Sequence, residues 1–410
     1  NVFPGLKDAK FDLLKVRVAA GQTGNDASTY MTESYFGIVS SGYTRLPLNG
    51  ASGLTENNRK PAANLKPEMT TEWEVGLTAA LFQNRLNLDL TYYDKVTKDQ
   101  IVSATLPPET GYTTETKNVG KIGNKGIEAA LSFTPVRKGD WEWEVGTTFA
   151  KNVSKVIELW DGLDEYSYIS SYSVYGVLKV GEPLLQLRIP ALQTVEDPNS
   201  PYYGYEVVNN NGVPVVDATK YKYLGSTQPD FTMGFNTTLK WKNLTFTAVG
   251  DWRHGGIMYS RTANITGFNG NATFTVRNER DAMVLPKTVK QVNGQYVENN
   301  IPIMASYWPT AFGNQSMARV RENWVLPKDY FKLREVTLAY SLPSKLLKTT
   351  FLKQVTVSAI GRNLFLGTPE KNNLVDPEST NLGNDLNSEF GETGGTISTR
   401  NFGFGLKVVF

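Results

Sequence analysis

The most regular feature of this chain is a two-residue alternation of apolar and polar side chains. Residues 398–410, STRNFGFGLKVVF, carry Phe402, Phe404 and Leu406 at even positions, whereas the odd positions 401–407 hold asparagine, glycine and lysine. The same period recurs in residues 84–94, NRLNLDLTYYD. A helix would spread such side chains around its circumference, while a β-strand sorts them onto two opposite faces. The pattern therefore predicts strands with one apolar and one polar face.

Ten strands of this kind can be marked along the chain, and most of them are long. Their lengths of about 11–14 residues exceed the roughly 5–6 residues of ordinary globular sheets, whereas a tilted membrane strand needs about 9–11 residues. In the eighth strand the alternation slips between Leu333 and Val336, which predicts a β-bulge near Arg334 and Glu335. The ten predicted strands are residues 12–22, 69–82, 85–97, 125–136, 140–152, 230–241, 243–254, 329–342, 354–366 and 398–410.

Short and long connections alternate along the chain. The predicted hairpins turn at Gln83-Asn84, at residues 137–139 and at Lys242, and residues 343–353 join the eighth and ninth strands. Outer-membrane barrels collect short turns at the periplasmic rim and long loops at the outer rim. We therefore expect an all-β fold, a transmembrane antiparallel β-barrel wall with long extracellular loops. The long connections are residues 23–68, 98–124, 153–229, 255–328 and 367–397.

The two faces of these strands differ as if one met lipid and the other met water. Charged side chains such as Glu72, Asp89 and Asp251 alternate with apolar neighbours. In a packed core these charges would be costly to bury, whereas they cost little when they face a wide aqueous lumen. The alternative is a soluble β-protein with the aromatic residues in its core. On the barrel interpretation, the expected lipid-facing anchors are Trp73, Trp141, Trp143, Trp241, Trp252, Phe402 and Phe410.

The composition excludes several classes of function. With 42 Lys and Arg against 40 Asp and Glu, the net charge is +2, so no nucleic-acid surface is expected. The absence of Cys removes thiol catalysis and cysteine-bound zinc. The one histidine, His254, has no evident catalytic partner and is expected to be a structural residue at a loop base. GETGG at 391–395 lacks a following helix and a lysine, so no phosphate site is expected. We predict no catalytic residues and no enzyme activity.

The long connections are rich in aromatic residues beside amide and hydroxyl side chains. Such rings can stack on sugars or line peptide pockets, while the alternative is that the loops bury the rings against one another. Residues 204–217 are expected to form a small hairpin that turns at residues 209–212. The loop aromatics predicted to bind substrate are Tyr172, Tyr203, Tyr205, Tyr307 and Trp308.

No cofactor is expected. Asp197, Asn199 and Asp217 carry oxygen atoms of the kind that ligate calcium, but no spacing pattern fixes such a site in the extracellular loops. Calcium is therefore left open and unsupported, and no metal ligand is predicted.

Several stretches of the sequence also resemble a known family. These are LKPEMTTEWEVGL (65–77), NVGKIGNKGIEAALSFTPV (118–136), VGEPL (180–184), YFKLREVTLAYSLP (330–343) and GRNLFL (361–366). They are similar to the C-terminal half of the SusC/RagA-type TonB-dependent outer-membrane transporters of Bacteroidota. Each stretch alone is modest evidence, but their order and their spread over most of the 410 residues make the resemblance specific.

The resemblance implies a 22-stranded barrel closed around a plug. Members of the family import oligosaccharides or peptides that a SusD-like surface lipoprotein captures, and the TonB–ExbB–ExbD machinery supplies energy through the plug. Residues 1–410 would form the C-terminal portion of such a barrel, about ten strands, without the plug, the TonB box or the early strands. The implied location is the outer membrane of a Gram-negative, Bacteroidota-like cell, in contact with outer-membrane lipid.

The resulting hypothesis is a component of an outer-membrane nutrient importer, with a glycan or a peptide as ligand. A passive porin or a surface binding protein is the alternative, and an outer-membrane hydrolase is less favoured because the catalytic groups are missing. The long loops carry no recognisable ligand motif, so the sequence does not identify the nutrient.

Overall fold

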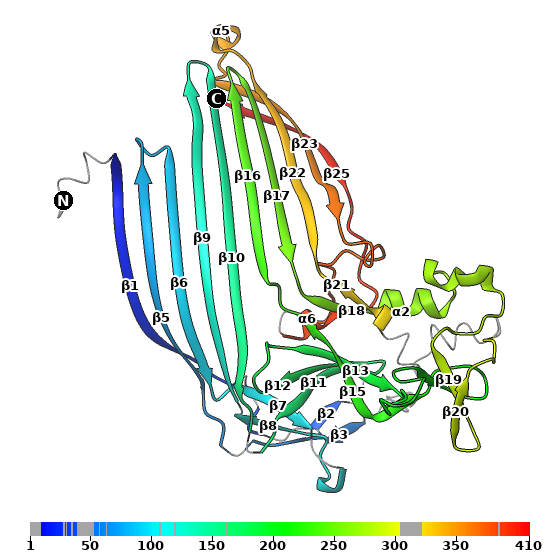
Figure 1. Ribbon diagram of the computed structural model, residues 1–410. Coiled ribbons are helices and arrows are strands. Elements are labelled where there is room, and N and C mark those ends of the chain that lie inside the picture. The colour runs from blue at the N-terminus through cyan, green and yellow to red at the C-terminus, as the bar shows by residue number, and fades with distance from the viewer. Residues whose placement is uncertain are drawn as a thin grey trace.

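The main element of the computed structural model is a ten-stranded antiparallel sheet, which forms the curved wall in Figure 1. The structure describes residues 10–27, 29, 31–33, 36–38, 53–56, 58–62, 64–105, 108–118, 120–160, 162–303, 322–383 and 386–410. All ten predicted strands are present, and they lie side by side in the order of the sequence. They are β1 (Phe11–Asn25), β5 (Glu68–Leu81), β6 (Leu86–Lys98), β9 (Lys121–Lys138), β10 (Trp141–Glu158), β16 (Phe231–Trp241), β17 (Leu244–His254), β22 (Tyr330–Ser341), β23 (Gln354–Gly367) and β25 (Asn401–Val409).

The predicted alternation of short and long connections is confirmed. The β5–β6 turn is built from Phe82, Gln83 and Asn84 at positive φ, and the β16–β17 turn has Lys242 at φ 51°. Between β22 and β23 the chain makes one short helix, α5 (Ser344–Leu347). These connections lie at one end of the wall, together with the C-terminus, and the long connections lie at the other end (Figure 1). We call these the short-turn end and the long-loop end.

The predicted bulge in β22 is also confirmed. The ladder with β17 pairs Val249 with Glu335 and then Gly250 with Leu333, so that Arg334 is the extra residue. Below the bulge Lys332 pairs with Asp251. Because an extra residue resets the alternation, Lys332, Arg334 and Glu335 all reach the polar face, which a regular strand would not allow.

The apolar face of the wall is open to its surroundings. Phe402 and Phe404 on β25 are 78 % and 89 % exposed, and Val16 and Val18 on β1 are also exposed. No helix in the described part of the chain is long and apolar enough to cross a membrane. Since hydrophobic side chains are so exposed on the strands, the wall itself has no packed core on this side, as expected for strands that face lipid rather than a soluble interior.

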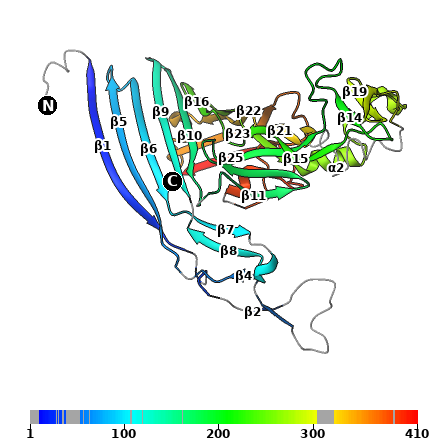
Figure 2. The same cartoon turned by 60° about the horizontal axis from the view of Figure 1, so that its bottom comes forward.

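The long connections fold into small sheets of their own, which cluster at the long-loop end (Figures 1 and 2). The predicted hairpin at 204–217 is confirmed: Val208 bridges Pro214, and Asn209 Oδ1 accepts hydrogen bonds from the N–H groups of Asn211 and Val213. The small sheets as a group were not predicted. They are β11–β12–β13–β15 (Glu165–Ser171, Val174–Lys179, Gln186–Leu192, Val216–Ser226), β14–β19–β20 (Glu206–Val208, Thr288–Val292, Gln295–Glu298), β21–β18–β24 (Val325–Pro327, Ile257–Ser260, Gly391–Glu392), β4–β8–β7 (Arg59–Lys60, Thr114–Asn118, Ile101–Thr105) and β2–β3 (Phe36–Ile38, Leu54–Glu56).

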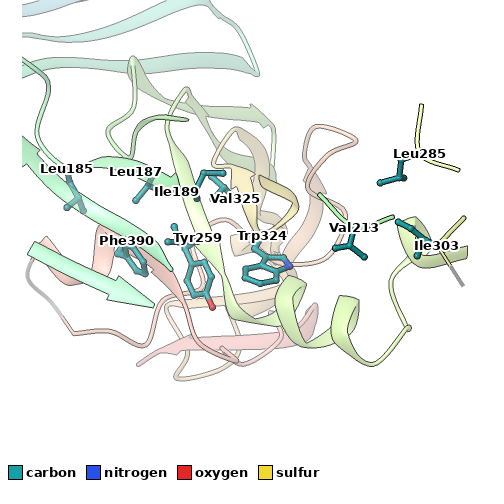
Figure 3. Close-up of a cluster of buried hydrophobic side chains, with 11 residues drawn as sticks. Leu185, Leu187, Ile189, Val213, Tyr259, Leu285, Ile303, Trp324, Val325 and Phe390 are labelled. Carbon is teal, nitrogen blue, oxygen red and sulfur yellow. The ribbon is translucent and has the colours of Figure 1, made fainter. Parts of the chain in front are cut away.

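A hydrophobic core joins three of the long connections. Tyr259, Trp324 and Phe390 are fully buried in it, and the rings of Tyr259 and Phe390 lie 5.3 Å apart between centroids (Figure 3). Leu187 of β13 packs into the same cluster from a third connection. Burial of one such side chain contributes about 1.5–3 kcal/mol. Trp324 of this core belongs to the 3₁₀ turn η4 (Glu322–Trp324), and Phe390 ends the helix α6 (Leu386–Phe390). The other described helices of the long connections are α2 (Arg261–Phe268) and the 3₁₀ helices η1 (Pro108–Thr110) and η2 (Thr273–Arg280).

Candidate functional site

Several charges on the polar face of the wall are paired. On β1 and β6, Arg17 Nη2 lies 2.7 Å from Asp89 Oδ1, and Thr78 Oγ1 of β5 donates to Asp89 Oδ2 at 2.6 Å. The guanidinium lies over Gly76, where an added Cβ would come within 2.4 Å of Arg17 Nε. Both partners are partly exposed. The predicted polar face therefore carries a partly exposed ion pair, and the glycine leaves room for the arginine.

A denser charge cluster lies where β22 reaches the long-loop end. Lys332 Nζ is 2.7 Å from both carboxylate oxygens of Asp376, and each of these side chains is only 8 % exposed. Tyr330 Oη donates to Glu378 Oε1 at 2.7 Å, and Lys332 and Arg334 also contact Glu378. Three successive polar-face residues of β22 thus hold two acids of the last long connection. We call residues 368–400 the last loop and these five side chains the wall clamp.

The wall clamp keeps Glu378 ionised. Burial by itself raises the pKa of Glu378, but hydrogen bonds from Arg334, Lys332 and Tyr330 outweigh it and lower the pKa to about 2. Arg334 is shared with Asp251 of β17, whose Oδ2 lies 2.7 Å from Arg334 Nη2. The bulge is what brings Arg334 into this position, so the backbone irregularity serves the contact between the wall and the loop.

Two further carboxylates fasten the last loop. Glu389 Oε2 lies 2.7 Å from Lys328 Nζ, and burial lowers the pKa of Lys328 to about 8 despite this partner, so the lysine stays largely charged at pH 7. Glu392 is fully buried, and it accepts hydrogen bonds from Thr262 N and Thr262 Oγ1 at 2.9 Å and from Gly394 N at 2.6 Å. Since Asp376, Glu378, Glu389 and Glu392 each have donors, these four described carboxylates hold the loop without an uncompensated buried charge.

Two adjoining hollows lie between the last loop and the wall. The β23–β25 ladder ends at the pair Arg362–Asn401, and beyond it β23 continues while the chain before β25 diverges. The hollows have volumes of about 330 and 350 Å³ and share Leu366, Asp376 and Ser398 in their linings. Three predicted strands line one side of the hollows and the last loop lines the other. No periodicity in residues 368–397 points to the hollows.

The predicted substrate-binding aromatics do not form one site in the described residues. Tyr203 is 59 % exposed, whereas Tyr205 packs against Tyr202 with ring centroids 5.7 Å apart. Tyr172 packs on the hydrophobic core that joins the three long connections, which we call the loop core, and the Arg261 guanidinium lies 3.5 Å from the ring centroid of Tyr172. Tyr307 and Trp308 lie outside the described residues. Substrate contact by any of the five remains a prediction.

For other loop aromatics the alternative interpretation is correct. Tyr259 and Trp324 are completely buried in the loop core. Their rings therefore contribute packing within the loops, and they are not open to a ligand.

The predicted lipid-facing anchors are exposed on the apolar face. Trp141 and Trp241 stack with centroids 5.5 Å apart beside the short turns, and Trp252 meets Phe231 edge to face at 5.0 Å near the long-loop end. Their positions agree with aromatic belts near both rims, and their contact with lipid remains a prediction. The exposed fractions are 38–46 % for Trp73, Trp141, Trp143, Trp241 and Trp252, 78 % for Phe402 and 68 % for Phe410.

The described residues contain no group of three or more His, Cys, Asp or Glu side chains that could hold a metal ion. Asp197 Oδ1 and Asp217 Oδ1 instead accept hydrogen bonds from the N–H groups of Asn199 and Thr219 in local turns. His254 Nδ1 lies 2.8 Å from Asp329 at the base of a long connection. Nothing in the structure tests calcium binding, so it stays an open proposal.

Comparison with known proteins gives consistent matches to one family. Residues 11–282 match the family described as "TonB dependent receptor-like, beta-barrel". TonB-dependent receptor P26 of Formosa agariphila is 29 % identical over an alignment of 392 residues that covers 91 % of this chain and 37 % of that protein. TonB-dependent receptor SusC of Bacteroides thetaiotaomicron is 25 % identical over an alignment of 247 residues that covers 57 % of this chain and 24 % of that protein. The chain thus spans less than half the length of these relatives.

The fold is also similar to that of solved structures. The structure of the RagAB peptide transporter aligns with a TM-score of 0.69 at 20 % identity, and it covers 97 % of this chain and 41 % of that chain. The RagAB peptide importer in its 'closed-closed' state aligns equally well, with a TM-score of 0.69 at 18 % identity over 97 % of this chain and 41 % of that chain. At these identities the likeness concerns the fold.

Proposed function

The chain belongs to the TonB-dependent receptor-like β-barrel family, and from that premise we propose that it forms the ligand-facing wall and outer loops of a nutrient importer. Receptors of this family, such as SusC, are β-barrels of the outer membrane, and the chain is located there. They are receptors and transporters rather than enzymes. The observation that carries the proposal is the ten-stranded wall, which is apolar on one face and polar, with several ion pairs, on the other.

The proposed cargo is an oligosaccharide or a peptide, captured together with a SusD-like surface lipoprotein. Support comes from the similarity to SusC and to the RagAB peptide transporter. The proposed energy source is the TonB–ExbB–ExbD machinery, which would act on the plug of the complete protein. The polar face suits transient binding, because hydroxyl and charged side chains on it can meet a hydrated ligand while several of its charges already have partners.

Uptake in living cells tests this proposal. The complete protein that contains this chain would be expressed in a strain that lacks its own copy, and entry of fluorescently labelled oligosaccharides and peptides would be followed with and without functional TonB. We expect uptake that requires both the protein and TonB. Uptake that persists equally without TonB would favour a passive porin, and surface binding without entry would favour a surface binding protein.

A further inference from the structure

We propose that the two adjoining hollows beside the last loop are a preformed subsite for an uncharged segment of an oligosaccharide. This inference rests on the proposed importer function and adds the place and the class of ligand. The volumes of about 330 and 350 Å³ fall at the lower end of the range of roughly 300–1,000 Å³ that small-molecule sites occupy. Together the hollows have room for more than one sugar ring.

The walls of the hollows are fixed before any ligand arrives. On one side the wall clamp holds Asp376 against Lys332. On the other side Asn372 is almost fully buried, and its Nδ2 donates to the backbone oxygen of Pro327 at 3.0 Å. Glu392, which also borders one hollow, is tied to Thr262. Because these contacts are already made, binding would require little ordering of the protein.

The charges that line the hollows are largely used within the protein. Both oxygens of Asp376 face Lys332, and Glu378 is held by Tyr330 and Arg334. Glu392 forms no ion pair but accepts hydrogen bonds from Thr262 and Gly394. Among the described residues Arg400 is the one lining charge with neither an ion pair nor a side-chain hydrogen bond. A ligand with several charges would therefore find few free partners, and removing its charges from water without partners would be unfavourable.

The remaining lining combines neutral hydrogen-bonding groups with apolar side chains. Ser398 and Thr399 offer hydroxyls, and Leu366, Leu374 and Ile397 offer apolar surface, with Ile397 90 % exposed. A sugar ring has an apolar face of C–H groups and a rim of hydroxyls that both donate and accept. The lining offers both apolar surface for the C–H face and hydrogen-bonding groups for the hydroxyls of a sugar ring. A short peptide would bring two charged ends, for which the lining has few free partners. The chemistry thus points to an uncharged sugar segment.

Filling the hollows tests the inference. Ser398 borders both hollows and is exposed, so Ser398→Trp should occlude them while every residue of the wall clamp is kept. Leu374→Trp fills the second hollow from another part of its lining. It keeps the test valid if Ser398→Trp fails to fold. Gln295→Trp on the exposed β20 hairpin is the matched control. Binding of maltohexaose, laminarihexaose, xylohexaose and a tryptic casein digest to the purified complete protein would be measured by calorimetry.

We expect at least one hexasaccharide to bind, with a Kd raised tenfold or more by either hollow-filling substitution and unchanged by Gln295→Trp. Wild-type sugar binding in both folded Ser398→Trp and Leu374→Trp would overturn the subsite. Binding of the casein digest alone, or of no probe, would overturn the ligand class. TonB-dependent uptake measured in parallel separates the two proposals. Uptake that persists equally without TonB, together with the expected binding pattern, refutes the importer alone. TonB-dependent sugar uptake, together with wild-type sugar binding in both hollow-filling variants, refutes the subsite alone.

Discussion

The wall clamp makes a quantitative prediction about the last loop. Lys332 and Asp376 are each 8 % exposed and are joined by two contacts of 2.7 Å. Lys332→Met removes the cation and keeps the length of the side chain, which leaves Asp376 buried without its main partner. Loss of one partner of a buried pair costs about 3–5 kcal/mol.

The expected cost of Lys332→Met lies near the lower limit of this range, because both acids keep other partners. Asp376 Oδ1 still accepts the N–H of Glu378 at 3.0 Å, and Glu378 itself keeps Arg334 and Tyr330. About 3 kcal/mol corresponds to an increase of roughly 10²-fold in the opening equilibrium of the loop. In the double variant Lys332→Met with Asp376→Leu no charge is left unpaired, so most of this loss should be recovered.

Hydrogen exchange followed by mass spectrometry on the complete protein can measure the opening. The reporting amides are those of Asn372, which donates to Pro369 O at 2.8 Å, and Ser379, which donates to Asp376 O at 2.9 Å. Lys371→Met changes an exposed lysine of the same loop and serves as the control. If exchange at these amides is the same in Lys332→Met and in Lys371→Met, the clamp does not hold the loop and the reasoning is wrong.

Three other predictions concern the lipid face, acid and the loop aromatics. Leu88→Arg or Leu406→Arg should impair folding into lipid vesicles at a midplane cost of about 2–4 kcal/mol, and normal insertion of both variants would show that the faces are assigned wrongly. The pKa of Glu378 lies at about 2, below its ordinary 4.5, so the stability that its ionised form gives the closed loop is present above pH 4.5 and is lost as the pH falls towards 2. Hydrogen exchange at the Ser379 amide, corrected for the intrinsic effect of pH, should therefore rise as the pH falls from 4.5 to 2. If this rise is as large in Glu378→Gln as in the wild type, Glu378 is not its cause. Substitution of Tyr203 or Trp308 by Ala should leave the melting temperature unchanged, and the loop-binding hypothesis fails if a screen of such variants never alters ligand uptake.

The wall could be predicted from the sequence because its structure repeats every two residues. Each strand must show apolar groups to one side and polar groups to the other, so its existence, its face and its approximate ends can be read locally. Even the bulge at Arg334 is visible, since the extra residue breaks the alternation between Leu333 and Val336. The fold class and the order of turns follow from the same signal.

The long-loop end could not be predicted in the same way. Lys332 meets Asp376 across 44 positions in the sequence, and no period in residues 368–397 marks that partner. Trp324 and Tyr259 are large aromatics in loops, and the sequence alone does not distinguish a ring buried in a shared core from one that is open to ligand.

A local signal was available in one case and was missed. Asn293-Gly294 has both residues at positive φ and turns the β19–β20 hairpin, as such a dipeptide often does. The alternation of apolar and polar residues on either side of this dipeptide is too short to predict a strand. Turn chemistry was therefore the one cue that could have found this part of the long-loop end.

The shared core of the long connections restricts how this protein can diversify. Because Leu187, Tyr259 and Phe390 come from three separate connections and pack together, a change in one connection must be matched in the other two. Chimaeras between relatives should therefore exchange residues 159–230, 255–329 and 368–400 as a set, with junctions inside the strands, where only alternation has to be preserved. New ligand preferences would then arise by recombination that exchanges all three connections together more readily than by mutations that accumulate in one connection.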